Sequence, residues 1–215
     1  MPNIPRKSAI LTTAYFPPVQ YMTKFILYPE ILLEAEEHYQ QQSYRNRAVI
    51  SGPNGLQNLS IPIKKSSKQK MHIQKVEIDY KTDWQKEHWR SIENAYKSSP
   101  FFEFYEDAFL PFFEKQSYRF LFDFNLQILN TLLHEIDIKN SPILSKQFSS
   151  DTESDDYRFG IHPKAKLQKP DNFFRPKAYT QVFSDRFDFF PNLSILDLLF
   201  NQGPNTENFL KACLV

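Results

Sequence analysis

Two segments rich in Phe and Leu, residues 102–114 and 118–136, constrain the fold of this chain more than any other feature. Both are long enough to be helices, and side chains this apolar are stable only when most of them are buried. The chain has 215 residues, 41% of them hydrophobic and 16% aromatic, which is enough for one sizeable core and barely enough for two. We therefore expect one domain over 1–215, with these helices supplying its core.

Short apolar runs predict a small mixed β-sheet flanked by those helices, which makes the fold class α/β. Residues 9–15 have the pattern of a buried strand, and Pro17-Pro18 ends it before a helix or turn over 19–27. Residues 31–39 suit a helix or a strand. A junction from strand to helix is a place where α/β folds often bind ligands, so Tyr15 is a candidate substrate-binding residue.

A hairpin is the clearest local prediction. Residues 44–50 and 56–63 are its strands, and Asn54-Gly55 lies in the turn between them, where a tight reversal needs positive φ angles. Residues 76–80 alternate between apolar and polar and predict a third strand of this region.

The other elements follow from capping and breaking signals. Thr82 and Gln85 have the spacing of a capping box, so a helix should run from there to about residue 97. Residues 141–171 are polar and predict a long loop or insertion. Residues 178–183 predict a last strand, and residues 193–200 a closing helix that ends near Gly203-Pro204.

Scarce glycine excludes several chemistries. The chain has four glycines, and they cannot form GxGxxG, GxxxxGK[ST] or GxSxG, the motifs of dinucleotide, phosphate-loop and nucleophile-elbow proteins. The five histidines show no HExxH or similar spacing, so we predict no metal site. Cys213 is the lone cysteine, which rules out an internal disulfide.

Net charge and hydropathy limit the classes of partner that we expect for this chain. Lys and Arg total 26 and Asp and Glu total 25, so the chain has no general attraction for nucleic acid or anionic membrane. No apolar stretch approaches the roughly 20 residues of a membrane-spanning helix, and the N-terminal segment lacks a signal-peptide core. We expect a cytoplasmic protein without membrane insertion or nucleic-acid binding. The sequence specifies no cofactor and no oligomeric state.

Six segments in a fixed order are the most specific motifs of the chain. They are AYFPP at Ala14–Pro18, YRNR at Tyr44–Arg47, GPNG with the following LSIPIKK, DWQKEHWRSIENAY with the following SPFF, YTQVF at Tyr179–Phe183, and NLSILDLLFNQGP at Asn192–Pro204. With these segments the chain resembles the WbqC-like family, a bacterial family with members associated with gene clusters for cell-surface polysaccharide and O-antigen.

The resemblance implies an α/β protein, proposed in some settings to be a transferase that decorates a sugar or related acceptor. Two departures affect the site. The family commonly has Gln-Pro where this chain has Thr13-Ala14, which removes an amide that could contact a ligand. The acidic residues that usually follow the second hydrophobic segment are shifted or replaced, and the nearest here are Glu34, Glu36 and Glu37.

The hairpin carries the best candidate for anion binding. Arg45 and Arg47 share one face of the predicted strand, with Asn46 between them, and a guanidinium presents paired donors to a phosphate or carboxylate. Lys64 ends the next strand and can join them. The alternative is an exposed strand face with ordinary ion pairs.

His88 is the candidate general acid or base, because its ordinary pKa lies near neutrality. It also belongs to the apolar stripe of its helix, which favours a packed core imidazole. Other candidate substrate-binding residues lie near the C-terminus, namely Tyr179 and Gln181 on the predicted last strand, Asn192, and Asp197. Their alternatives are sheet packing for the first two and helix capping for the last two, with Asp197 the acidic half of a capping box begun by Ser194.

Two classes of function remain. One is a transferase acting on a small-molecule or nucleotide-linked substrate that carries a phosphate or carboxylate, in surface-polysaccharide or related small-molecule modification. It predicts a concave site where Arg47, Lys64 and His88 converge. The other is a non-catalytic ligand-binding or accessory protein.

Overall fold

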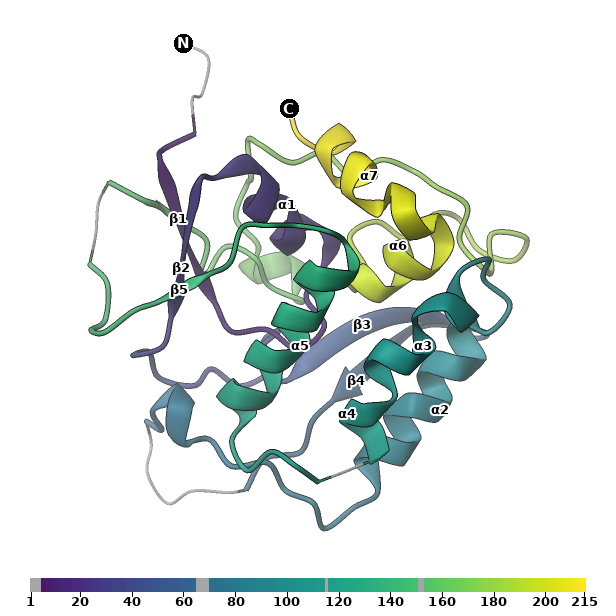
Figure 1. The fold of residues 1–215 in the computed structure, drawn as a ribbon, viewed down its shortest axis with the longest axis horizontal. Coiled ribbons are helices and arrows are strands. Elements are labelled where there is room, and N and C mark those ends of the chain that lie inside the picture. Colours follow the sequence, from purple (N-terminus) through teal and green to yellow (C-terminus); the bar gives the residue numbers. More distant parts are fainter. Residues whose placement is uncertain (1–4, 65–69, 115, 151–152) are drawn as a thin grey trace.

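A four-stranded parallel sheet forms one part of the fold (Figure 1). The computed structural model describes residues 5–64, 70–114, 116–150 and 153–215. The strands are β1 (Ser8–Thr12), β2 (Glu30–Glu34), β5 (Ile143–Leu144) and β6 (Asp155–Asp156), in the order β5-β2-β1-β6. The α/β fold class is therefore confirmed. Segment 141–171, expected to be a polar loop or insertion, supplies both outer strands.

The β1–α1–β2 unit follows the sequence closely. Ala9, Ile10 and Leu11 are fully buried, as expected of a parallel strand covered on both faces. Helix α1 (Val19–Leu27) begins directly after Pro18, whose fixed φ suits a helix start. β2 then pairs with β1 in parallel, which settles the ambiguity of residues 31–39 as a strand that ends at Glu34.

The predicted hairpin is present as β3 (Arg47–Gly52) and β4 (Gly55–Ser60). Both strands are shorter than predicted at their outer ends, at Arg47 and Ser60, and extend further into the turn, to Gly52 and Gly55. Only Gly55 in the turn has a positive φ, of 99°, whereas we expected positive angles at Asn54 as well. Pro53 explains the difference, because its ring holds φ negative and forces the reversal onto the glycine.

The Phe- and Leu-rich segments form helices that supply the core, as predicted. They are α3 (Phe102–Phe109), α4 (Pro111–Glu114) and α5 (Leu121–Glu135), and α2 (Trp84–Tyr96) lies beside them. The expected single helix over 102–114 is split because Pro111 has no N–H to continue the hydrogen-bond ladder. In Figure 1, α5 lies between the parallel strands and the group α2, α3 and α4. Aromatic rings fill this layer, and Phe16 stacks on Phe113 with ring centroids 6.1 Å apart.

Two predicted strands are wrong. Residues 76–80 make only the isolated bridges Ile63↔Ile78 and Glu77↔Phe120, and a longer ladder is blocked where Pro62 lacks an N–H. Residues 178–183 have no strand pairing, because the chain turns there through backbone bonds such as Phe187 N–H to the Phe183 carbonyl. The described residues also include three short 3₁₀ helices, Ile73–Lys75, Ala165–Leu167 and Gly203–Asn205.

The C-terminal helices are α6 (Ile195–Gln202) and α7 (Thr206–Ala212), of which only the first was predicted. Ser194 caps α6 by accepting from the Leu196 N–H at 3.3 Å. The N-cap of α2 is Asp83, without a side-chain cap, instead of the predicted Thr82, and Asp197 bonds residues outside its helix. None of the helices in the described ranges is long and apolar enough to cross a membrane.

Candidate functional site at the carboxyl edge of the sheet

The carboxyl ends of the four parallel strands meet at one edge of the sheet. From β1 the chain runs to β2 on one side, and β6 pairs with β1 on the other, so the strand order reverses between β1 and β6. Open α/β sheets bind ligands just outside the carboxyl ends of the strands at such a switch point. Residues that follow Thr12, Glu34, Leu144 and Asp156 therefore form the candidate site.

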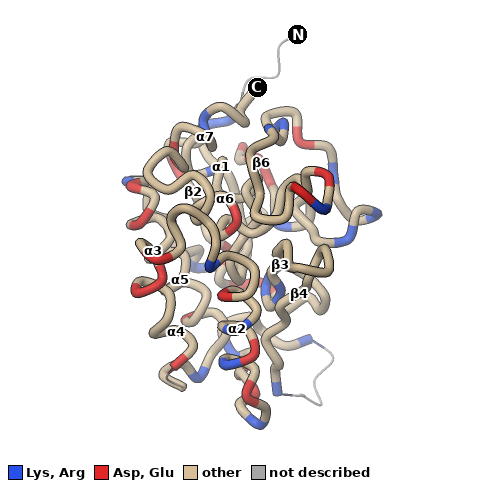
Figure 2. The backbone as a smooth tube through the Cα atoms, turned by 90° about the vertical axis from the view of Figure 1, so that its right-hand side faces the viewer, with Lys and Arg blue, Asp and Glu red and all other residues tan. Residues whose placement is uncertain are grey.

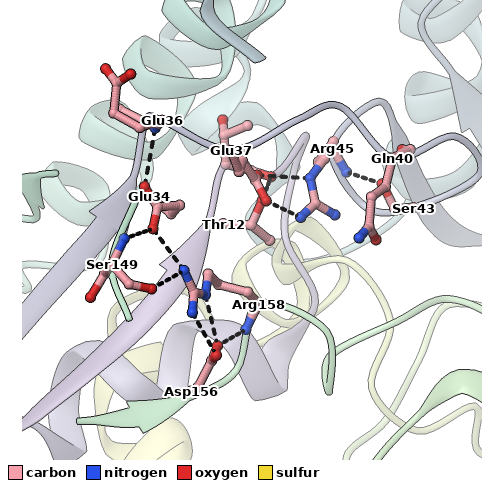
Figure 3. Close-up of polar contacts among 12 residues, drawn as sticks. Thr12, Glu34, Glu36, Glu37, Gln40, Ser43, Arg45, Ser149, Asp156 and Arg158 are labelled. Atoms are coloured by element: carbon pink, nitrogen blue, oxygen red, sulfur yellow. Dashed lines mark hydrogen bonds and ion pairs between the residues drawn. The ribbon is translucent and has the colours of Figure 1, made fainter. Parts of the chain in front are cut away.

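One buried cluster at this edge joins Thr12, Glu37 and Arg45 (Figure 3). Arg45 donates to Glu37 from Nε at 2.8 Å and also from Nη2, and the Thr12 hydroxyl donates to the same carboxylate. The side chains of Arg45 and Glu37 are both only 2% exposed. The Arg45 guanidinium expected on an open strand face is thus inside the protein, held by a carboxylate that follows β2.

A second cluster joins Glu34 and Arg158. Glu34, fully buried at the end of β2, accepts from Arg158 Nη1 at 2.8 Å, from Ser145 Oγ at 2.6 Å and from the Ser149 N–H at 2.9 Å. Asp156 accepts from the other side of the same guanidinium (Figure 3). Burial acts to raise the pKa of Asp156, but the bonds from Arg158 outweigh it and hold that pKa below its ordinary value. Three segments distant in sequence, at residue 34, residues 145–149 and residues 156–158, are thereby tied together at one edge.

The junction after β1 is strained. Phe16 has a φ of +39°, in the left-handed region that bulky side chains rarely adopt. The ring is fully buried in the aromatic core, which holds the backbone in this conformation. Backbone strain of this kind concentrates at functional sites, where the surrounding structure maintains it.

Basic and hydrogen-bond-donating side chains gather beside the two clusters, in a group that we call the basic cluster. Its members are Tyr39, Arg45, Arg47, His162 and Lys164. Arg45 in this group is paired with Glu37, and Lys164 donates to Gln42. Burial raises the pKa of Tyr39, and the charges of Arg47 and Arg45 oppose this rise. The charges of Lys164 and Arg45 also reach His162. Glu37 pairs with Arg45, whereas Arg47 has a buried Nε without a hydrogen-bond partner and no acidic partner among the described residues.

His162 contributes a donor to this cluster. Its Nδ1 accepts from the Lys164 N–H at 3.0 Å, so in the neutral ring the hydrogen is on Nε2, which has no partner within the described part of the chain. Burial, together with the charges of Lys164 and Arg45, lowers the pKa of His162. The residue therefore presents an N–H group from a neutral ring.

Tyr15 and His88 lie together in the aromatic core. The Tyr15 hydroxyl is 2.9 Å from His88 Nδ1, and the ring of Tyr15 stacks on Phe124. Burial raises the pKa of Tyr15 and lowers that of His88 to about 4. The pair is thus neutral near pH 7 and packed against apolar groups.

The C-terminal candidates form a separate buried group. Asp197, fully buried, accepts from the Tyr179 hydroxyl at 2.5 Å and from Gln181 Nε2 at 2.9 Å. Burial raises the pKa of Asp197. Asn192 instead bonds Gln20 of α1, with its Oδ1 accepting from the Gln20 N–H at 2.8 Å.

The two remaining candidates are also engaged elsewhere. Lys64 donates to Glu77 at 2.7 Å on the surface and does not join an ion-pair network with Arg45 or Arg47. Asn46 donates to the Ile61 carbonyl at 2.9 Å, which ties the start of the hairpin. Sequence reasoning missed Thr12, Arg158 and His162, and it noted Glu34 and Glu37 only through the family pattern.

Basic and acidic residues are mixed over the molecule as a whole. Figure 2 shows basic and acidic residues interspersed along the chain, so any attraction for an anion has to be local. Within residues 5–64, 70–114, 116–150 and 153–215, no three His, Cys, Asp or Glu side chains converge in a way that could hold a metal ion.

The sheet topology shows an α/β protein, and the strained junction and the charged edge mark a candidate polar site at its switch point. The model of the WbqC-like protein family matches residues 13–169, and the chain belongs to that family. Uncharacterized protein Rv1507c of Mycobacterium tuberculosis is 25% identical over 232 residues, an alignment that covers 97% of this chain and 99% of that protein. No solved structure matches the chain at a significant level.

Proposed function

We propose that this chain binds a small molecule bearing a phosphate or carboxylate at the carboxyl edge of its parallel sheet. The observation that carries the proposal is the basic cluster, in which Arg47 and His162 have donors without partners among the described residues. A guanidinium and a neutral imidazole N–H match the oxygens of such an anion. The switch point between β1 and β6 supports the same location.

The two buried ion pairs support a role beyond stability. Burying Glu37 with Arg45 and Glu34 with Arg158 removes four charges from water, and the attraction within such pairs often fails to exceed this desolvation cost. They hold the backbone after β1, β2 and β6 in fixed relative positions. A preformed edge of this kind lowers the entropy lost when a ligand binds.

The reaction class that we propose is group transfer, in surface-polysaccharide or related small-molecule modification. Family membership motivates it, and the cluster provides a site for a nucleotide-linked or other anionic donor. The alternative is a non-catalytic ligand-binding or accessory protein. The specific observation in its favour is the position of His88, which is packed beside Tyr15 in the core and away from solvent.

The test is ligand binding by wild type and two matched variants. Purified protein is screened by thermal shift against nucleotides, nucleotide sugars, acyl-coenzyme donors and amino acids, and a selective ligand should raise the melting temperature. Arg47→Met should abolish the shift. Arg90→Met, an exposed residue of α2, should keep it. Equal shifts in both variants, or no shift with any anionic compound, would count against the proposed site.

Catalysis is tested with the ligand found in this way. Mass spectrometry of ligand, acceptor sugar and protein should show a transferred group in the presence of wild type. His162→Gln should lower the amount of product more than it lowers binding, because the amide keeps a hydrogen-bond donor but cannot carry a proton. Binding without any product would support the non-catalytic alternative.

A further inference from the structure

A surface depression beside the edge strand β5 adjoins the site described above and is lined mostly by residues outside it. It has a volume of about 560 Å³ and is lined by Leu32 and residues 143–150. This volume falls in the range of small-molecule sites. Three large apolar side chains stand in it and are exposed, Ile143 by 53%, Leu144 by 40% and Phe148 by 50%. We call this depression the edge groove.

Such a group of exposed apolar side chains is unusual on a soluble protein and marks a binding surface. The groove is built mostly from one eight-residue stretch of chain, in which Ile143 and Leu144 are adjacent and Phe148 follows four residues later. Its backbone is fixed, since Leu32 and Leu33 pair in register with Ile143 and Leu144. The apolar surface is therefore held open by the sheet.

The edge groove is continuous with the candidate site. Ser145 and Ser149 line the groove, and both donate to the Glu34 carboxylate of the second cluster. The guanidinium of Arg158 lies over the Phe148 ring, 4.5 Å from its centroid. A molecule in the groove is thus one side chain away from the Glu34–Arg158 pair.

The charge at the groove is positive. Lys146 lines it and has no ionic partner within the described residues, and none of the lining residues is acidic. An apolar surface with one free ammonium group at its margin suits a molecule that has a hydrocarbon chain and a negative head.

We propose that the edge groove binds the hydrocarbon chain of an amphipathic anion whose charged head faces the carboxyl edge of the sheet. The proposal rests on the proposed function and names its substrate class, an acyl or alkyl chain carrying a phosphate or carboxylate. The chain packs on Ile143, Leu144 and Phe148. Lys146 attracts the head toward the site.

Isothermal titration with three probes tests this inference. Octyl phosphate has both chain and head, methyl phosphate has the head alone, and 1-octanol has the chain alone. Octyl phosphate should bind at least about tenfold more tightly than methyl phosphate, since several buried methylenes contribute. Octanol should bind weakly, and Lys146→Gln should weaken octyl phosphate without changing octanol.

Matched variants locate the chain. Ile143→Ser should weaken octyl phosphate about fivefold and leave methyl phosphate unchanged, because it removes groove surface without touching the Phe148–Arg158 contact. Leu56→Ser is the control, since Leu56 is similarly exposed, at 55%, but lies on β4. Equal losses in the two variants would show unspecific adsorption and overturn the inference.

The outcomes separate the groove from the anion site. Equal affinity for octyl and methyl phosphate overturns the groove and leaves the anion site standing. Tight octyl phosphate and octanol binding that Ile143→Ser weakens, with no methyl phosphate binding, supports the groove and counts against the anion site. A dimer in sedimentation analysis that Ile143→Ser dissociates and Leu56→Ser does not would also overturn the inference, because the groove would then be a subunit contact.

Discussion

Arg45 Nε lies 2.8 Å from Glu37 Oε1, and each side chain is only 2% exposed to solvent. The guanidinium comes from the loop before β3, and the carboxylate comes from the loop after β2. Each therefore neutralises a charge that the other loop could not bury alone. The loss of one partner leaves an isolated charge in a dry environment, which is far more costly than the loss of both.

Arg45→Met should accordingly lower the free energy of unfolding by about 3–5 kcal/mol. Adding Glu37→Gln should restore a large part of that loss, because the amide is neutral and still accepts the hydrogen bond from Thr12. Urea denaturation of the two single variants and the double variant measures the coupling. A single-variant loss below about 1 kcal/mol would show that water reaches the pair.

Arg47→Met, unlike Arg45→Met, should not lower the free energy of unfolding. Arg47 Nε is buried and has no partner in the part of the chain that the structure describes, so replacing the guanidinium by an apolar chain of similar length removes an unsatisfied donor. The free energy of unfolding should stay the same or rise by up to about 1 kcal/mol. Denaturation of Arg47→Met beside Arg90→Met measures this, and a loss of more than about 1 kcal/mol would assign Arg47 to the scaffold.

His88 should make the protein sensitive to acid. Burial lowers its pKa from 6.5 to about 4, so the folded protein resists protonation that the unfolded chain accepts. The contribution to stability is complete above pH 6.5 and is lost as the pH falls from 6.5 toward 4, by about 3 kcal/mol in total. His88→Gln should flatten this part of the stability curve.

The matched control for that measurement is His134→Gln, because the His134 side chain is 85% exposed. Its stability curve should follow that of wild type between pH 4 and 7. Parallel curves for His88→Gln and wild type would mean that the imidazole is accessible to protons in the folded protein.

Gly203 should not tolerate a side chain. Its φ is +54°, and a Cβ atom there would lie 2.5 Å from two ring atoms of Phe101. Gly203→Ala should therefore cost at least about 2 kcal/mol of unfolding free energy, from backbone strain and from displacement of the ring. At Gly160 a Cβ would make ordinary contact with Lys169 at 3.5 Å, so Gly160→Ala should lie within about 0.5 kcal/mol of wild type.

The predictable part of this fold is the part built from apolar side chains. β1, the β3–β4 hairpin and helices α2, α5 and α6 follow from apolar runs and turn residues, with small errors at their ends. β6 could not be found in this way, because its two residues are Asp155 and Asp156. Their strand geometry depends on pairing with Ala9 and Ile10, more than 140 residues earlier.

The candidate site was harder to predict, because it too depends on contacts between residues distant in sequence. Arg47 and the Arg45 guanidinium were identified from residue type, but the burial of Arg45 depends on Glu37, and a sequence pattern does not show which charges pair. Arg158 and His162 lie in a segment without periodicity, so local signals could not identify them. The alternation of Tyr179 and Gln181 was assigned to a strand, whereas both side chains bond Asp197.

The Glu34–Arg158 pair spans 124 residues of sequence. At a synthesis rate of about 5–20 residues per second, on the order of 10 s pass between the synthesis of Glu34 and that of Arg158. For that time β1 and β2 have an open edge, and Glu34 lacks its cation. The carboxyl edge therefore cannot assemble until Arg158 has emerged, and the hydrophobic core is completed later still, because α6 and α7 supply part of it.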